Sequence, residues 1–131
     1  RSTLFPYTTL FRSLRYINLM IHRQKPIEFM GRSLQDIRAM LDEARQRAGF
    51  ALDAIQRGHP PLDAKPMTTV GGGVMELRIW CADGTWRIIY AAQFEDAIYV
   101  LHVFQKKTRK TPQKDLEIAR THFRQIKTRH S

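Results

Sequence analysis

The sequence has one cysteine, no long apolar run and few acidic residues, and each shortage excludes a class of protein. Cys81 alone cannot form an internal disulfide, and no cluster of cysteines and histidines has the spacing of a zinc site. No apolar run approaches the roughly 18 residues that a membrane-spanning helix needs. The segment 14–21 is too short and too polar for a signal peptide. We therefore expect a cytoplasmic protein with no membrane partner.

Recognisable catalytic motifs are also missing. The chain has no Ser-His-Asp arrangement, no paired-carboxylate motif and no metal-binding motif, so we expect no cofactor. The run Gly71-Gly72-Gly73 precedes a predicted strand, and no Gly-Lys-Ser/Thr follows it, so it predicts a turn rather than a phosphate loop. We expect Cys81 to be a small buried or half-buried residue and not a nucleophile.

Positive charge is the strongest feature of the composition. The chain carries 22 Lys and Arg against 12 Asp and Glu, which gives a formal net charge of +10. Residues 105–131 hold nine basic and two acidic residues, whereas residues 20–64 hold seven and six. A concentrated basic block favours a polyanionic partner such as nucleic acid or the ribosome. A basic protein without such a partner is the alternative.

The beginning of the chain differs in character from the rest. Residues 3–13 read TLFPYTTLFRS, which is the translation of a widely used sequencing adapter. Met20 is a plausible start. We therefore expect residues 1–19 to be a non-native leader, of which 1–13 derive from the adapter, and residues 20–131 to form a single domain. We expect residues 1–13 to pack loosely or not at all.

A helical pattern extends from Ser33 to Gly58, with an apolar residue every three or four positions. It predicts a helical hairpin, or one bent helix, that covers a sheet. Ser33 with Asp36 suggests a capping box, Gly49 is the expected break, and Gly58 is the expected end. The apolar stripe consists of Leu34, Ile37, Leu41, Ala44, Ala48, Leu52 and Ile55.

Three strands are predicted over residues 74–80, 85–92 and 97–104, because these runs are rich in β-branched and aromatic residues. Asp83-Gly84 is a hairpin signal, and the short links make the strands antiparallel neighbours. A last helix is predicted from a Thr111 cap and Pro112. Its apolar stripe is Leu116, Ala119, Phe123 and Ile126. The fold class is therefore α+β: a helical hairpin on a three- to four-stranded antiparallel meander, with a C-terminal helix.

Two arginines interrupt the apolar strands. Neighbouring strand residues point to opposite faces, so Arg78 and Arg87 lie opposite the apolar residues beside them. If both face one groove, they form a cationic floor, and the loop 106–110 forms a cationic rim. Such a groove suits a phosphate backbone, and Trp80 or Phe104 could stack on bases. Solvated strand arginines beside a basic surface loop are the alternative.

Several segments resemble the RelE/HigB toxin superfamily, most closely its phage-derived (gp-forty-nine-like) HigB branch. The resemblance covers roughly residues 25–127. It is carried by VMELRI at 74–79, GTWRIIY at 84–90 and YVLHVFQKKTRKTP at 99–112, with KPM at 65–67. It implies a RelE-like fold and the toxin of a type II toxin–antitoxin system. Such a toxin cleaves mRNA on the ribosome and is silenced by a helix-turn-helix antitoxin.

The resemblance also implies roles for individual residues. Basic side chains would hold the phosphate and stabilise its charge while the 2′-OH attacks it, without a metal. The candidate catalytic residues are Arg87, Arg78, Lys107 and His102. The candidate RNA-binding residues are Lys65, Lys106, Arg109, Lys110, Trp80 and Phe104. For His102 a buried structural role is an alternative, and we expect Tyr90 to be a core residue.

Two other functions fit the same pattern. A ParE-like toxin of the same superfamily would inhibit gyrase and cut no RNA. A non-catalytic nucleic-acid-binding module would bind RNA or DNA in a salt-dependent way without cleavage.

Overall fold

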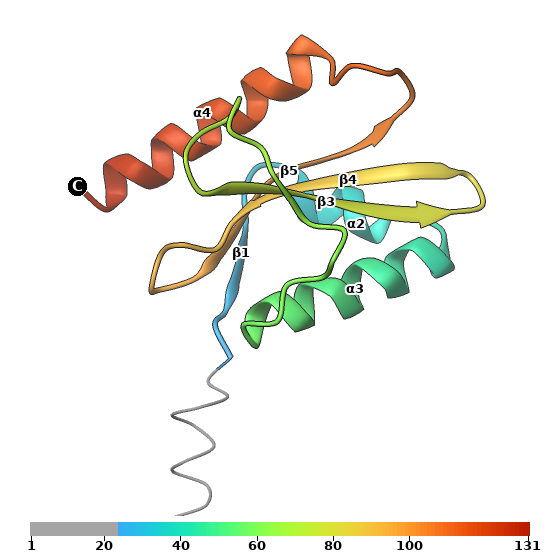
Figure 1. The fold of residues 1–131 in the computed structure, drawn as a ribbon, viewed down its shortest axis with the longest axis horizontal. Coiled ribbons are helices and arrows are strands. Elements are labelled where there is room, and N and C mark those ends of the chain that lie inside the picture. The colour runs from blue at the N-terminus through green and yellow to red at the C-terminus, as the bar shows by residue number, and fades with distance from the viewer. Residues whose placement is uncertain (1–23) are drawn as a thin grey trace, which may run out of the picture.

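The computed structural model describes residues 24–131. The leader predicted for residues 1–19 lies outside the described residues. The described chain folds into a single sheet with helices on both of its faces (Figure 1). The fold is therefore α+β, as predicted.

The sheet has five strands in the order β1-β5-β4-β3-β2. Their bounds are β1 Ile27–Phe29, β2 Lys65–Pro66, β3 Val74–Cys81, β4 Gly84–Ala91 and β5 Ile98–Lys106. The antiparallel β3, β4 and β5 confirm the predicted meander. With β2, which pairs antiparallel with β3, the sheet has the four antiparallel strands of the prediction, but the prediction missed a fifth strand, β1, which pairs in parallel with β5. The edge strands β1 and β2 have three and two residues, which is too short for an alternating pattern.

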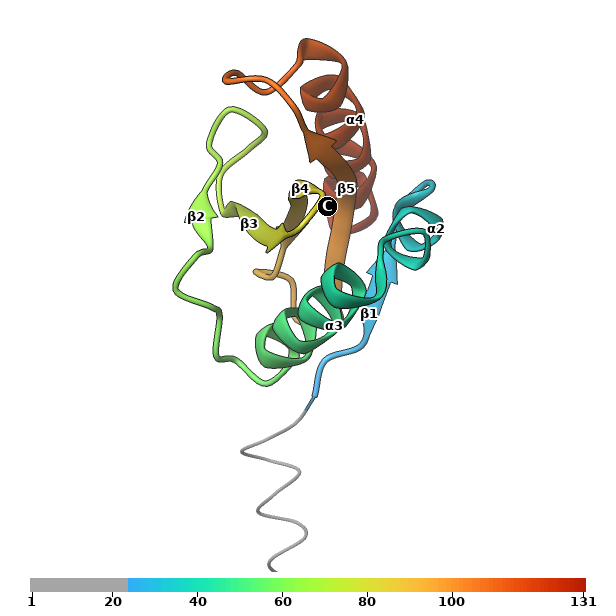
Figure 2. The same ribbon diagram turned by 90° about the vertical axis from the view of Figure 1, so that its right-hand side faces the viewer.

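The helices lie on opposite sides of the sheet (Figures 1 and 2). On one side, here called the α3 face, lie α2 (Ser33–Arg38) and α3 (Asp42–Gln56). On the other side, the α4 face, lies α4 (Gln113–Arg129). Each face has its own buried core. Ala48 and Leu52 of α3 pack with Leu77 and Ile88. Phe123 of α4 packs with Ile89 and other buried residues of the α4 face.

The N-terminal helical segment divides at a different place from the one predicted. Gly49 lies inside α3, and the break falls at residues 39–41. Leu41 is extended at the N-cap of α3 and 55% exposed, so it leaves the apolar stripe. Asp42 and Glu43 then occupy the first turn of α3, where acidic side chains favour the positive end of the helix dipole. Asp42 and Glu43 are a physical reason for a helix start here.

The predicted start of α2 is only partly confirmed, whereas the predicted end of α3 is confirmed. Ser33 does begin α2, but Arg32 is the N-cap and has no side-chain cap, so the capping box is absent. Gly58 does end α3: it has φ +84, and the amide of His59 donates to the Ala54 carbonyl at 2.8 Å. This is the Schellman arrangement, in which glycine tolerates the left-handed conformation.

Helix α4 begins two residues after the predicted cap. Pro112, rather than Thr111, is the N-cap, and no side chain caps the helix. The predicted apolar stripe is confirmed, since Ala119, Phe123 and Ile126 are buried and Leu116 packs beside them.

The triple glycine forms the loop that crosses α4 before β3. A Cβ added at Gly71 would lie 2.2 Å from the Phe123 ring, so only glycine allows this close approach. Gly73 has φ +83, a conformation that glycine adopts at little cost. The turn predicted here is therefore confirmed, and it packs against α4.

A β-bulge in β5 orients a candidate site residue. Ile89 pairs with His102 and Tyr90 pairs with Val100, so Leu101 has no partner in β4. The extra residue turns both Leu101 and His102 toward the α4 face, where Leu101 joins the core. The bulge thus brings His102 into contact with α4.

The C-terminal end of α4 is attached to the loop before β5 by a polar cluster. His130 Nε2 lies 2.9 Å from Asp96 Oδ1, and Nδ1 lies 2.9 Å from the Ile126 carbonyl oxygen. The Tyr99 hydroxyl donates to the other oxygen of Asp96 at 2.6 Å. Both ring nitrogens of His130 face acceptors, so the protonated imidazolium fits this site. The Ile126 carbonyl and Asp96 raise the pKa of His130, and Tyr99 and His130 lower the pKa of Asp96.

This cluster predicts a pH dependence for the end of α4. Because the folded pKa of His130 exceeds the usual 6.5, its stabilising contribution is complete below about pH 6.5 and is lost as pH rises through the folded value. The contribution of Asp96 is present above pH 3.8 and is lost as pH falls through its lowered pKa. NMR titration of His130 should give a midpoint above 6.5. A midpoint at or below this value would contradict the assignment.

Candidate functional site

Arg78 and Arg87 lie directly opposite each other on β3 and β4. Their strand neighbours Leu77, Ile79 and Ile88 belong to the core of the α3 face, so both arginines lie on the α4 face. Within the described residues, the Nε atom of each arginine is buried and has no hydrogen-bond partner. Buried guanidinium groups require acceptors, and two like charges side by side favour a bound anion. The expectation that both arginines face the same side is confirmed.

Glu76 forms an ion pair with Arg87. The Arg87 Nη1 atom donates to Glu76 Oε2 at 3.1 Å, and the two side chains are only 13% and 15% exposed. Glu76 lies two residues before Arg78 and so shares its face, and Lys65 of β2 is its register partner. Glu76 was not among the predicted site residues, although its spacing of two from Arg78 on a predicted strand places both on one face.

The two aromatic candidates for base stacking, Trp80 and Phe104, differ in exposure. Trp80 is 50% exposed, and the Arg78 guanidinium lies 5.6 Å from the centre of its ring. Trp80 therefore offers a free surface for stacking. Phe104, the register partner of Arg87, is only 7% exposed and stacks on His102. Phe104 is a core residue, and our expectation that it could stack on a base is corrected.

His102 has a carboxylate partner. Its Nε2 atom lies 2.7 Å from Oδ1 of Asp115 in the first turn of α4, and the side chains are 13% and 11% exposed. This pair attaches the start of α4 to β5, which favours the structural alternative for His102. Asp115 was not among the predicted site residues, because its role depends on the bulge in β5.

The predicted basic loop follows β5 directly. Lys106 is half-buried and lies on the α4 face, with Thr85 as its register partner. Lys107, Arg109 and Lys110 are exposed. Lys65 is exposed at the edge of the sheet. The two arginines are therefore the fixed part of the site, and the lysines form its border.

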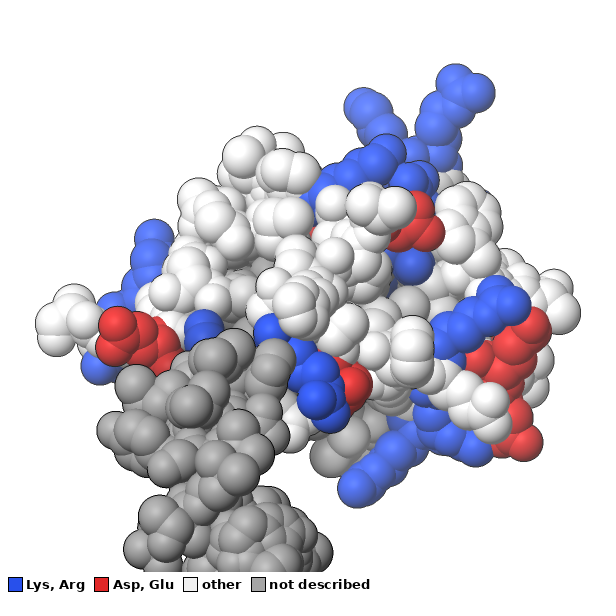
Figure 3. Space-filling model, turned by 60° about the horizontal axis from the view of Figure 1, so that its bottom comes forward, with Lys and Arg blue, Asp and Glu red and all other residues white. Residues whose placement is uncertain are grey.

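Charge is unevenly distributed over the surface. Figure 3 shows basic side chains projecting together at the upper edge, and basic and acidic side chains intermingled at the lower right. On α3 the arginines are neutralised by neighbouring carboxylates, in the pairs Arg45–Asp42, Arg47–Glu43 and Arg57–Asp53. The loop 106–110 has no ion pair among the described residues. Part of the unpaired positive charge therefore lies in the loop that follows β5, beside the half-buried Arg78 and Arg87.

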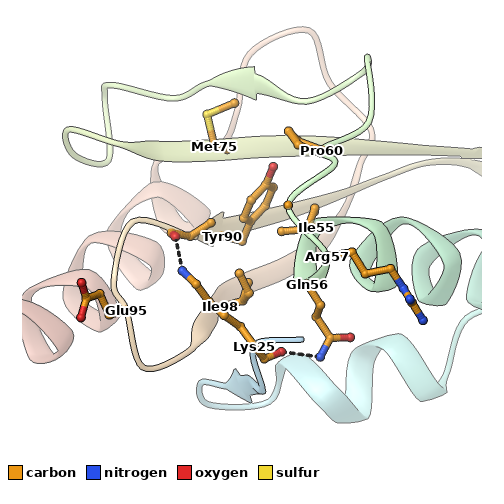
Figure 4. Close-up of a pocket in the computed structure, with 11 residues that line it drawn as sticks. Lys25, Ile55, Gln56, Arg57, Pro60, Met75, Tyr90, Glu95 and Ile98 are labelled. Atoms are coloured by element: carbon orange, nitrogen blue, oxygen red, sulfur yellow. Dashed lines mark hydrogen bonds between the residues drawn. The ribbon is translucent and has the colours of Figure 1, made fainter. Parts of the chain in front are cut away.

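A cavity of about 780 Å³ lies on the α3 face, away from these arginines (Figure 4). Tyr90 and Ile55 line it, and Lys25 at its border donates to the carbonyls of Ala92 and Phe94 at 2.8 and 2.6 Å. Tyr90 is 1% exposed, which confirms a core position, and burial raises the pKa of its hydroxyl. The predicted site residues do not line this cavity.

Other expectations concern cysteine, metals and membranes. Cys81 is half-buried, as predicted, and the pKa of its thiol is raised by the hydrogen bond to Asp83.

Residues 24–131 contain no group of three or more His, Cys, Asp or Glu side chains placed to hold a metal ion. None of the helices described in this range has the length and apolarity to cross a bilayer.

Comparison with known proteins identifies the family. None of the curated proteins compared with the chain matches it. The family model described as "Phage derived protein Gp49-like" matches residues 35–124, which span α3, β3, β4 and β5 and most of α4. The match includes Glu76, Arg78 and Arg87. The chain therefore belongs to the family of Gp49-like phage-derived proteins.

Proposed function

We propose that the protein is the toxin of a type II toxin–antitoxin system and that it cleaves mRNA on the ribosome. Membership of the Gp49-like family and the resemblance to RelE/HigB toxins support this function. The observation that carries it is the pair Arg78 and Arg87, which lie side by side on the α4 face, with Glu76 as the carboxylate partner of Arg87 in the described residues. An RNA phosphate would accept hydrogen bonds from the remaining N–H groups of the two guanidinium groups.

The proposed chemistry needs no cofactor. The ribose 2′-OH attacks the adjacent phosphorus, and the bond to the 5′-oxygen of the next nucleotide breaks. The proton leaves the 2′-OH, and the departing oxygen takes one up. Arg78 and Arg87 stabilise the additional negative charge of the pentacoordinate phosphorus. Glu76 positions Arg87, while Trp80 supports a base beside the phosphate.

The proposed partners are mRNA, the ribosome and a helix-turn-helix antitoxin, and the proposed location is the cytoplasm. Lys65, Lys106, Arg109 and Lys110 would contact phosphates around the site. Lys107 remains a candidate for proton transfer. Contacts of this kind position a nucleic acid without reading its sequence.

Expression of the protein in bacteria, followed by mapping of RNA ends, tests the function. We expect growth arrest and new in-frame ends within translated messages. Growth arrest with intact messages and DNA damage would favour the gyrase-inhibiting alternative. Folded protein that causes neither arrest nor cleavage would refute the toxin function.

A further inference from the structure

Helix α4 carries a row of basic side chains apart from the Arg78–Arg87 site. Arg120, Arg124 and Lys127 follow one another at spacings of four and three residues and so share one side of the helix. Arg120 donates to the carbonyl of Thr69 at 2.8 Å, which turns this side toward the loop before β3. We call these three residues the α4 basic row.

The α4 basic row is not neutralised within the described residues. None of its members has an ion pair, whereas Arg45, Arg47 and Arg57 on α3 all do. Arg124 contacts only the Thr121 hydroxyl at 3.2 Å, and Lys127 lies 5.0 Å from the Phe123 ring. Glu117 is the one exposed carboxylate on α4, because Asp115 is buried against His102. The row therefore has free positive charge to offer a partner.

The position of the row connects it to the proposed site. Helix α4 starts directly after the basic loop 106–110, and Lys114 in its first turn is exposed. Glu117 lies between the helix start and the row, so the loop and the row are two separate basic regions at the two ends of α4. Arg124 lies 11 residues after the helix start at Gln113, which corresponds to roughly 16 Å along the axis. A single-stranded RNA would need several nucleotides to contact both the Arg78–Arg87 site and Arg124.

The chemistry of the row favours nucleic acid over protein. Protein interfaces generally have an apolar or aromatic centre. The large exposed apolar residues in the described part of the chain are Leu41, Phe50, Leu62 and Trp80, and none of them lies on α4. A row of cations without an apolar centre suits a phosphate backbone.

We propose that the α4 basic row is a second contact for the RNA backbone, beyond the Arg78–Arg87 site. This inference rests on the proposed function and extends it. The preferred ligand is then an RNA long enough to reach from the site along α4. Affinity for long RNA depends on the row, whereas affinity for a short RNA depends on the Arg78–Arg87 site and its bordering lysines.

The test uses the full chain and two RNAs that cannot be cleaved because they carry 2′-O-methyl groups, one of 20 nucleotides and one of three. The double variant R124Q/K127Q should bind the 20-nucleotide RNA about tenfold more weakly at 0.1 M salt. The slope of log affinity against log salt should fall by about 1.4, which is 0.7 for each lost contact with a single strand. Binding of the trinucleotide should not change. The matched control R38Q/R45Q removes two exposed arginines of α2 and α3, on the other face, and should leave both affinities unchanged.

Three results would overturn the inference. Unchanged binding of the 20-nucleotide RNA by R124Q/K127Q would overturn it. If Arg87→Gln weakened binding in the same assay, the proposed function would still stand. Equal losses of affinity in R124Q/K127Q and R38Q/R45Q would show that only the net charge of the protein matters. Loss of binding to an antitoxin with RNA affinity intact would assign the row to a protein. The proposed function itself would fail separately, through normal RNA binding and cleavage by Arg87→Gln.

Discussion

Replacing Arg87 by alanine is expected to abolish growth inhibition while the protein remains folded. In the proposed mechanism Arg87 stabilises charge that develops on the phosphorus, and removing one such group typically slows the chemical step by about 100- to 1,000-fold. Cleavage of a ribosome-bound message, followed by primer extension, measures the effect. Undiminished cleavage by Arg87→Ala would remove Arg87 from the site.

The ion pair with Glu76 requires its own controls. Arg87→Ala leaves a largely buried carboxylate without its partner, which destabilises by up to about 3 kcal/mol. The double variant E76Q/R87Q removes both charges and should recover most of that stability, yet remain inactive. Arg45→Ala removes an exposed, ion-paired arginine of α3 and should keep full activity. If E76Q/R87Q regained activity together with stability, the role of Arg87 would be structural.

The second large effect is expected for Gly71→Ala, which should lower the free energy of unfolding. The new Cβ would lie 2.2 Å from the Phe123 ring, which is 3% exposed and has little room to move. Overpacking of this kind costs roughly 1–3 kcal/mol. For a domain of this size each kcal/mol lowers the melting temperature by about 4–8 °C. Thermal unfolding followed by circular dichroism measures the change.

The neighbouring glycine provides a matched control. A Cβ added at Gly72 would meet nothing within 4 Å, so Gly72→Ala should leave the melting temperature almost unchanged. The double variant G71A/F123L should recover part of the loss, because the smaller side chain makes room. Equal stability of Gly71→Ala and Gly72→Ala would contradict the packing that we describe between this loop and α4.

The long elements of the fold were predictable from local pattern. Strands β3, β4 and β5 have eight or nine residues each, and α4 has a complete apolar stripe. Elements defined by distant contacts were not predictable. Strand β1 exists because Ile27–Phe29 pairs with residues 98–100, about 70 positions later. The break at residues 39–41 has neither glycine nor proline to mark it.

The candidate site likewise combines features that the local sequence predicts with features that depend on distant contacts. The shared face of Arg78 and Arg87 follows from strand alternation and the Asp83-Gly84 hairpin, which the sequence contains. The contact between His102 and Asp115 depends on the bulge at Leu101, which no local pattern indicates. The burial of Phe104 depends on α4 covering β5, so its sequence position alone suggested a free ring.

The proposed attack by the 2′-OH is the central claim, and a single substitution in the RNA tests it. Once a cleavage position has been mapped, the same message is prepared with one 2′-deoxyribose on the 5′ side of that bond and presented on ribosomes to the protein. We predict that this bond is not cut while other sites in the same message are cut as before. Cleavage of the deoxy-substituted bond at the normal rate would contradict the account.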